Sequence, residues 1–90
     1  MITKYTNEDL LKLLKEFLSN FDFHKINHYF ATDYCDEFTN ENDPIQNYLN
    51  DEFFDIDMMF HNAKDMKKIE IKTKEVLTNA IKMLENLNLT

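Results

Sequence analysis

The side chains with the clearest potential for chemistry are carboxylates concentrated in one part of the chain. Residues 26–63 contain no lysine or arginine and nine acids, which are Asp33, Asp36, Glu37, Glu41, Asp43, Asp51, Glu52, Asp55 and Asp57. The flanks are nearly neutral, so this acidic block accounts for the formal net charge of −7. Such a block repels nucleic acid and acidic membranes and attracts basic protein surfaces. It predicts a basic protein partner, with no direct nucleic acid or membrane binding.

Carboxylates can also catalyse acid–base reactions or bind calcium. Acid–base catalysis by a carboxylate pair requires burial that separates the two pKa values, whereas these acids fall on the expected solvent-facing sides of helices. An EF-hand loop needs glycine at its sharp turn, and the chain has no glycine. We therefore expect neither a catalytic site nor a calcium site.

Histidine and cysteine give weaker signals. His24 and His28 have the i, i+4 spacing that can present two imidazoles to a metal, but the HExxH pattern is absent. Surface or capping histidines are the interpretation we favour. Cys35 would need an adjacent base to act as a nucleophile, and His28 is too far along a helix, so a buried apolar role is expected. No metal or cofactor is predicted.

The elements that position these side chains are expected to be helices. With no glycine and one proline, tight glycine hairpins are not available, and apolar residues recur at helical spacing. Helices are expected to start after N-caps at four positions, the third with proline at N1 and glutamine at N3: Thr6, Asp22, Asp43 and Thr73.

The expected helices gather the acids into two clusters. One lies near the end of a second helix that reaches Phe38, and the other lies in the third helix, where Asp51 and Asp55 are i, i+4 neighbours. Two tyrosines beside them are expected to reach the surface and anchor a partner. The predicted binding surface is Asp33, Tyr34, Asp36, Glu37, Tyr48, Asp51, Glu52, Asp55 and Asp57. The alternative is a solvated face that only keeps the protein soluble.

The predicted fold is a single all-α domain over residues 1–90, a compact bundle of about four antiparallel helices. Residues 69–71 alternate apolar and polar types, so a short extended segment is expected there within the otherwise helical fold. A single cysteine, no visible signal peptide and no run of ~20 apolar residues favour a cytoplasmic location.

Several positions resemble the immunity proteins of colicin D and of related contact-dependent growth inhibition systems. The residues that carry the resemblance are Leu14, Phe17, Leu18, Glu52, Phe53, Phe54, Phe60, Ile69, Glu70, Ile71, Val76, Leu84 and Leu87. The acidic loop expected after Phe60 and a glycine before the last helix are missing. The resemblance implies a non-enzymatic inhibitor whose carboxylates replace RNA phosphates in the active site of a toxin nuclease, expected to be a tRNase. The alternative is a phage-encoded nucleic-acid mimic that inhibits a host defence nuclease.

Overall fold

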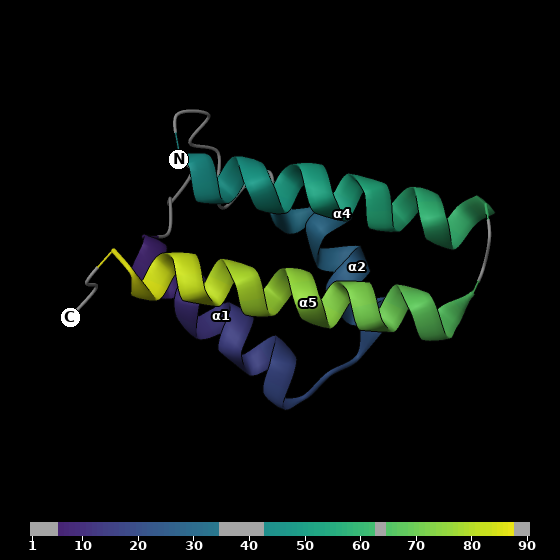
Figure 1. Cartoon of the computed structure of the whole chain (residues 1–90), viewed down its shortest axis with the longest axis horizontal. Coiled ribbons are helices and arrows are strands. Elements are labelled where there is room, and N and C mark those ends of the chain that lie inside the picture. The colour runs from purple at the N-terminus through teal and green to yellow at the C-terminus, as the bar shows by residue number, and fades with distance from the viewer. Residues whose placement is uncertain (1–5, 35–42, 63–64, 88–90) are drawn as a thin grey trace.

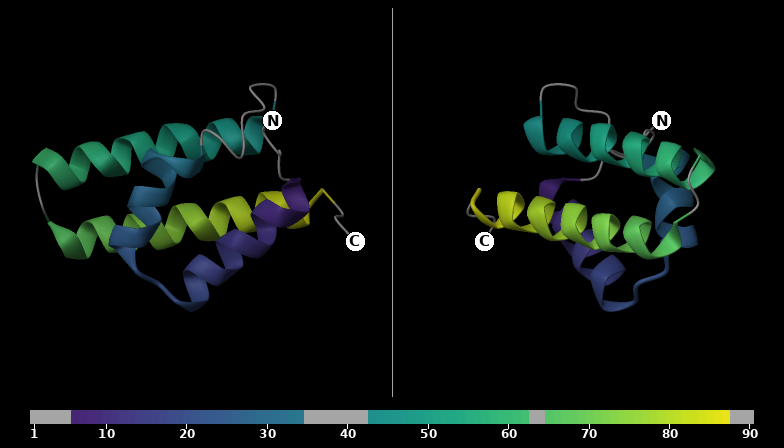
Figure 2. Two further views of the ribbon diagram at one scale, coloured as in Figure 1. Left: turned by 180° about the vertical axis from the view of Figure 1, so that it is seen from behind. Right: turned by 45° about the vertical axis from the view of Figure 1, so that its right-hand side comes forward.

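The computed structural model describes residues 6–34, 43–62 and 65–87, and in these ranges the regular structure is helical. The helices are α1 (Asn7–Ser19), α2 (Phe23–Ala31), α4 (Pro44–Asn62) and α5 (Met66–Glu85). Helices α4 and α5 lie side by side, α1 packs obliquely on α5, and α2 lies across the α4–α5 pair (Figures 1 and 2). The predicted all-α bundle is confirmed for these residues, with α4 and α5 as its antiparallel pair.

Three of the predicted helix starts are confirmed. The Thr6 hydroxyl accepts from the Asp9 N–H while the Asp9 carboxylate accepts from the Thr6 N–H at 2.9 Å, which completes a capping box. The Thr6 N–H and the Thr6 hydroxyl both donate to the Asp9 carboxylate, and these hydrogen bonds lower the pKa of Asp9. Asp22 accepts from the Lys25 N–H at the start of α2. Before α4, the Asp43 carboxylate accepts from the N–H groups two and three residues further on.

The predicted end of the second helix is wrong. Helix α2 stops at Ala31, and Thr32 is its C-cap. The Thr32 hydroxyl donates to the His28 carbonyl at 2.8 Å, and the Thr32 N–H bonds the same carbonyl. This local bonding by a β-branched residue competes with helix continuation. The first acidic cluster therefore does not extend α2: Asp33 lies beyond the break, and Asp36 and Glu37 lie outside the described residues.

The predicted start of the last helix is also wrong, and so is the extended segment at 69–71. Helix α5 begins after Asp65, whose side chain accepts from the Lys68 N–H. Ile69 and Thr73 are fully buried, and the Thr73 hydroxyl donates to the Ile69 carbonyl at 2.7 Å. Ile71 is 58% exposed. The i, i+4 spacing of the buried residues therefore outweighs the short alternation around Ile71.

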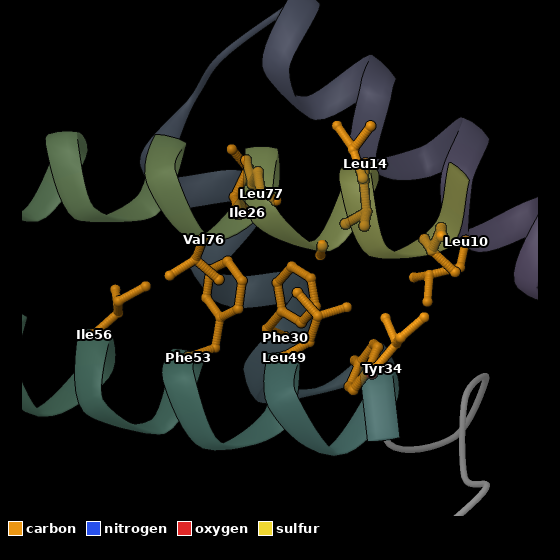
Figure 3. Close-up of a cluster of buried hydrophobic side chains, with 14 of the residues drawn as sticks. Leu10, Leu14, Ile26, Phe30, Tyr34, Leu49, Phe53, Ile56, Val76 and Leu77 are labelled. Atoms are coloured by element: carbon orange, nitrogen blue, oxygen red, sulfur yellow. The ribbon is translucent and has the colours of Figure 1, made fainter. Parts of the chain in front are cut away.

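The core lies among α1, α2, α4 and α5 (Figure 3). At its centre the rings of Phe30 and Phe53 stack, with centroids 3.8 Å apart and planes within 7° of parallel. Leu49 and Ile56 continue the α4 side of the core, and α1 and α5 contribute a further set of buried apolar residues: Leu10, Leu14, Ile69, Val76, Leu77, Ala80, Ile81 and Leu84. Burial of these apolar side chains gives the hydrophobic stabilisation that holds the helices together.

Polar groups also tie the N-terminal ends of α1 and α4 together. The Asn7 side-chain amide donates to the Asp43 carboxylate at 2.9 Å, and the buried Gln46 side chain donates to the Asn7 side-chain oxygen, Oδ1, at 3.3 Å. Asp43, one of the nine block acids, thus caps α4 and fastens it to α1. Tyr34, only 2% exposed, donates its hydroxyl to the Gln46 carbonyl at 2.9 Å.

Replacing Tyr34 by phenylalanine is expected to lower the free energy of unfolding by about 0.5–1.5 kcal/mol, because the buried hydrogen bond to Gln46 is lost while the ring is kept. Urea unfolding followed by circular dichroism measures this change. Tyr48→Phe is the matched control, since the Tyr48 hydroxyl bonds only an exposed amide on Asn79 among the contacts described, and its cost should be smaller. A larger loss for Tyr48→Phe would contradict the assignment of Tyr34 to the core.

Candidate functional site

One exposed face of α4 combines carboxylates with large apolar side chains. Asp51 and Asp55 are exposed and one helical turn apart. Phe54 is 66% exposed and Met58 is 48% exposed, and these two are also one turn apart. Because residues three and four positions apart are neighbours on a helix, the four side chains form one continuous surface. We call Asp51, Phe54, Asp55 and Met58 the α4 outer face.

Glu52, which the sequence placed on the partner-binding surface, is engaged within the protein. Its carboxylate accepts from the Lys72 ammonium of α5 at 3.1 Å. This hydrogen bond raises the pKa of Lys72 despite partial burial, and the nearby charges of Asp55 and Glu75 act in the same direction. Residues 26–63 contain no lysine, but the packing of α5 against α4 brings Lys72 next to this acidic block. Glu52 therefore fastens α4 to α5.

Glu52 pairs with Lys72 and the earlier residue Tyr48 pairs with the later residue Asn79. This order is the one expected for antiparallel helices. Tyr48 itself is half-buried and packs against the core. Its contact with Asn79 places it at the α4–α5 seam rather than on the α4 outer face.

Asp57 is half-buried on the side of α4 that faces α2. Its carboxylate accepts from the Asn27 amide at 3.2 Å and lies 3.4 Å from Nδ1 of His61. The same His61 nitrogen is 2.8 Å from the Asp57 carbonyl oxygen, near the end of α4. His61 lies in the last turn of α4. These contacts hold the Asp57 carboxylate in place beside a gap between the helices.

That gap is a pocket of about 270 Å³ between α2 and α4. Aromatic rings and a small methyl group supply its apolar walls, and two asparagines and one carboxylate supply its polar groups. The lining residues are Asn27, Phe30, Ala31, Asn50, Phe53, Phe54 and Asp57. We call it the α2–α4 pocket. Phe54 belongs both to this pocket and to the α4 outer face, so the two features form one continuous surface.

The predicted site residues do not share one surface. Asp51 and Asp55 lie on the α4 outer face, Asp57 lies on the side of α4 that faces α2, and Asp33 is exposed beyond α2. Tyr34 is buried in the core, so the expectation that it reaches the surface is wrong. The predicted binding surface did not include Phe54, Met58 or the pocket asparagines. A signal for Phe54 was present, because it follows Phe53 directly and therefore cannot share the buried stripe of α4.

Among the described residues, no group of three or more histidine, cysteine or acidic side chains is arranged to hold a metal. His24 and His28 are exposed, and the His24 ring makes an edge contact with Phe60, with centroids 5.8 Å apart. Cys35 lies outside the described residues. Within the described ranges, no helix combines the length and the apolar character that a membrane crossing requires.

Comparison of the chain with protein-family models, with curated proteins and with solved structures finds no match. The α4 outer face and the α2–α4 pocket are therefore the features of the structure that bear on its function.

Proposed function

We propose that this chain is a non-enzymatic inhibitor of the immunity-protein type, which binds a basic toxin nuclease through the α4 outer face. The nuclease is expected to be a tRNase. The observation that carries the proposal is the pairing of two exposed carboxylates, Asp51 and Asp55, with two exposed apolar side chains, Phe54 and Met58, on one helix face.

The charged half of this face is suited to a nuclease. An enzyme that cleaves RNA presents cationic groups to phosphate, and a carboxylate pair can occupy the same positions. Complementary charge also steers association, which reaches ~10⁸–10⁹ M⁻¹s⁻¹ at low salt. Rapid capture would protect a cell in which free toxin is lethal.

The apolar half of the face favours a protein partner over a merely solvated surface. Charged groups alone would suffice for solubility, whereas exposed Phe54 and Met58 leave apolar area in contact with water. Protein interfaces combine an apolar, often aromatic centre with a polar rim. The α4 outer face has both parts within two helical turns.

The test is a charge reversal on this face. Asp51→Lys combined with Asp55→Lys should weaken binding to the cognate nuclease, sought as the product of the adjacent gene, at least about tenfold, because two attractive pairs become repulsive. Calorimetry with the two purified proteins measures the affinity, and a tRNA cleavage assay measures inhibition. Both substituted positions are exposed, so helicity by circular dichroism should be unchanged.

Glu16→Lys combined with Glu70→Lys is the matched control. These acids are exposed on α1 and α5, and their reversal changes the net charge by the same amount. The control should retain nearly full inhibition and full protection of a toxin-exposed cell. Equal loss in the two double variants would mean that only overall charge matters, and full protection by the α4 variant would refute the proposal.

A further inference from the structure

We infer that the α2–α4 pocket receives one arginine side chain of the protein partner. The inference rests on the proposed function in one respect, since it takes the partner to be a basic protein. It adds the residue type that is recognised and the place where it binds.

The size of the pocket suits a single long side chain. Its volume of about 270 Å³ lies just below the ~300–1,000 Å³ in which whole small molecules bind. Phe30 and Phe53, which stack on each other with centroids 3.8 Å apart, line the apolar side of the pocket. At the rim, the exposed Phe54 ring offers a second aromatic surface.

The polar groups of the pocket select a cation. Asp57 brings a negative charge, and no lysine or arginine occurs in residues 26–63 to neutralise it from within the same segment. An anionic group would be repelled, and a purely apolar group would remove water from Asp57 and Asn27 without replacing their hydrogen bonds. A side chain with an aliphatic stem and a cationic end satisfies both the apolar walls and the carboxylate.

The Asp57 carboxylate is prepared for such a contact. Its Oδ1 is held by Asn27 at 3.2 Å and lies near His61, and a carboxylate has about four acceptor positions on its two oxygens. Because its position is already fixed, less conformational entropy is lost when a partner binds.

Arginine fits better than lysine. The planar guanidinium can stack on aromatic rings while its N–H groups donate to a carboxylate, whereas the ammonium is a compact and strongly hydrated charge. Cation–π attraction to phenylalanine adds to the contact. Arginine is also among the residues that most often dominate interface energetics.

The experiment is a titration of the ¹⁵N-labelled protein with N-acetyl-arginine amide, followed by NMR. The side-chain amides of Asn27 and Asn50 line the pocket and report on it directly. We expect saturable shifts of these two signals with the arginine probe. The neutral isostere N-acetyl-citrulline amide and the lysine analogue should shift them much less.

Matched substitutions distinguish binding in the pocket from nonspecific attraction by the negative charge of the protein. Asp57→Asn keeps an acceptor for Asn27 and removes the charge, so the affinity for the probe should fall at least about tenfold. Asp51→Asn removes the same charge outside the pocket and should change the affinity little. Phe54→Ala, at a position that is 66% exposed, should also weaken binding, and it serves as the test if Asp57→Asn unfolds the protein.

Equal shifts with arginine and citrulline, equal binding of lysine, or equal effects of Asp57→Asn and Asp51→Asn would each overturn the inference. The outcome is separable from that of the proposed function. Nuclease inhibition that survives without arginine binding would reject only the pocket, and arginine binding without nuclease inhibition would reject only the nuclease as partner.

Discussion

Replacing Phe53 by alanine is expected to lower the free energy of unfolding by about 3–5 kcal/mol. Phe53 is 4% exposed and stacks on Phe30 at 3.8 Å, so the substitution removes a ring from the centre of the core and ends the main aromatic contact between α2 and α4. Small domains are stable by only about 5–15 kcal/mol in total. The variant should therefore unfold at a much lower urea concentration and temperature than the parent chain.

The neighbouring substitution Phe54→Ala provides the control. It removes the same side chain one position along α4, but Phe54 is 66% exposed, so the expected change is within about 0.5 kcal/mol. Urea unfolding of both variants, followed by circular dichroism, makes the comparison. Similar midpoints for the two variants would mean that the orientation of α4 in this structure is incorrect.

Local features of the sequence were sufficient to predict most of the helices. The capping residues Thr6, Asp22 and Asp43 mark real starts, because a cap depends on groups within three positions of it. The alternation of Phe53 and Phe54 between core and surface likewise follows from the period of 3.6 residues. The all-α class was therefore predictable without knowledge of any distant contact.

The misplaced boundaries have physical causes that the apolar pattern does not contain. At Thr32 a single hydroxyl bonds the carbonyl four residues back and α2 ends there, although the apolar stripe continues beyond it. At α5 the alternation of residues 69–71 favoured an extended segment, while Ile69 packs into the core and Asp65 supplies a cap. In both places one side-chain interaction, rather than the pattern of apolar residues, determines the helix boundary.

The candidate site could be predicted only in part, because charge in the sequence does not show which carboxylates are already engaged. Asp43 caps α4, Glu52 binds a lysine twenty positions later in the chain, and Asp57 bonds an asparagine of α2. These pairings depend on how the helices pack. They leave Asp51 and Asp55 as the outward-facing acids of α4, and packing also creates the pocket that no single segment encodes.

Ile71→Pro is expected to destabilise the protein by about 3 kcal/mol or more, because proline inside a helix removes a backbone hydrogen bond and its ring clashes with the preceding turn. Ile71 lies in the second turn of α5, six residues after the Asp65 cap, and is 58% exposed. The loss therefore comes from the backbone rather than from a buried side chain. A helix that restarted at residue 71 would avoid the clash but would detach Ile69, which is fully buried.

Ile71→Ala is the control, since alanine is the best helix former and little apolar area is buried at this position. Its stability should stay within about 0.5 kcal/mol of the parent chain. Urea unfolding measures both variants, and the proline variant should also lose helical circular dichroism. If residues 69–71 were extended and the last helix began after Thr73, proline at position 71 would be tolerated. Equal stability of the two variants would therefore restore the extended segment and shorten α5.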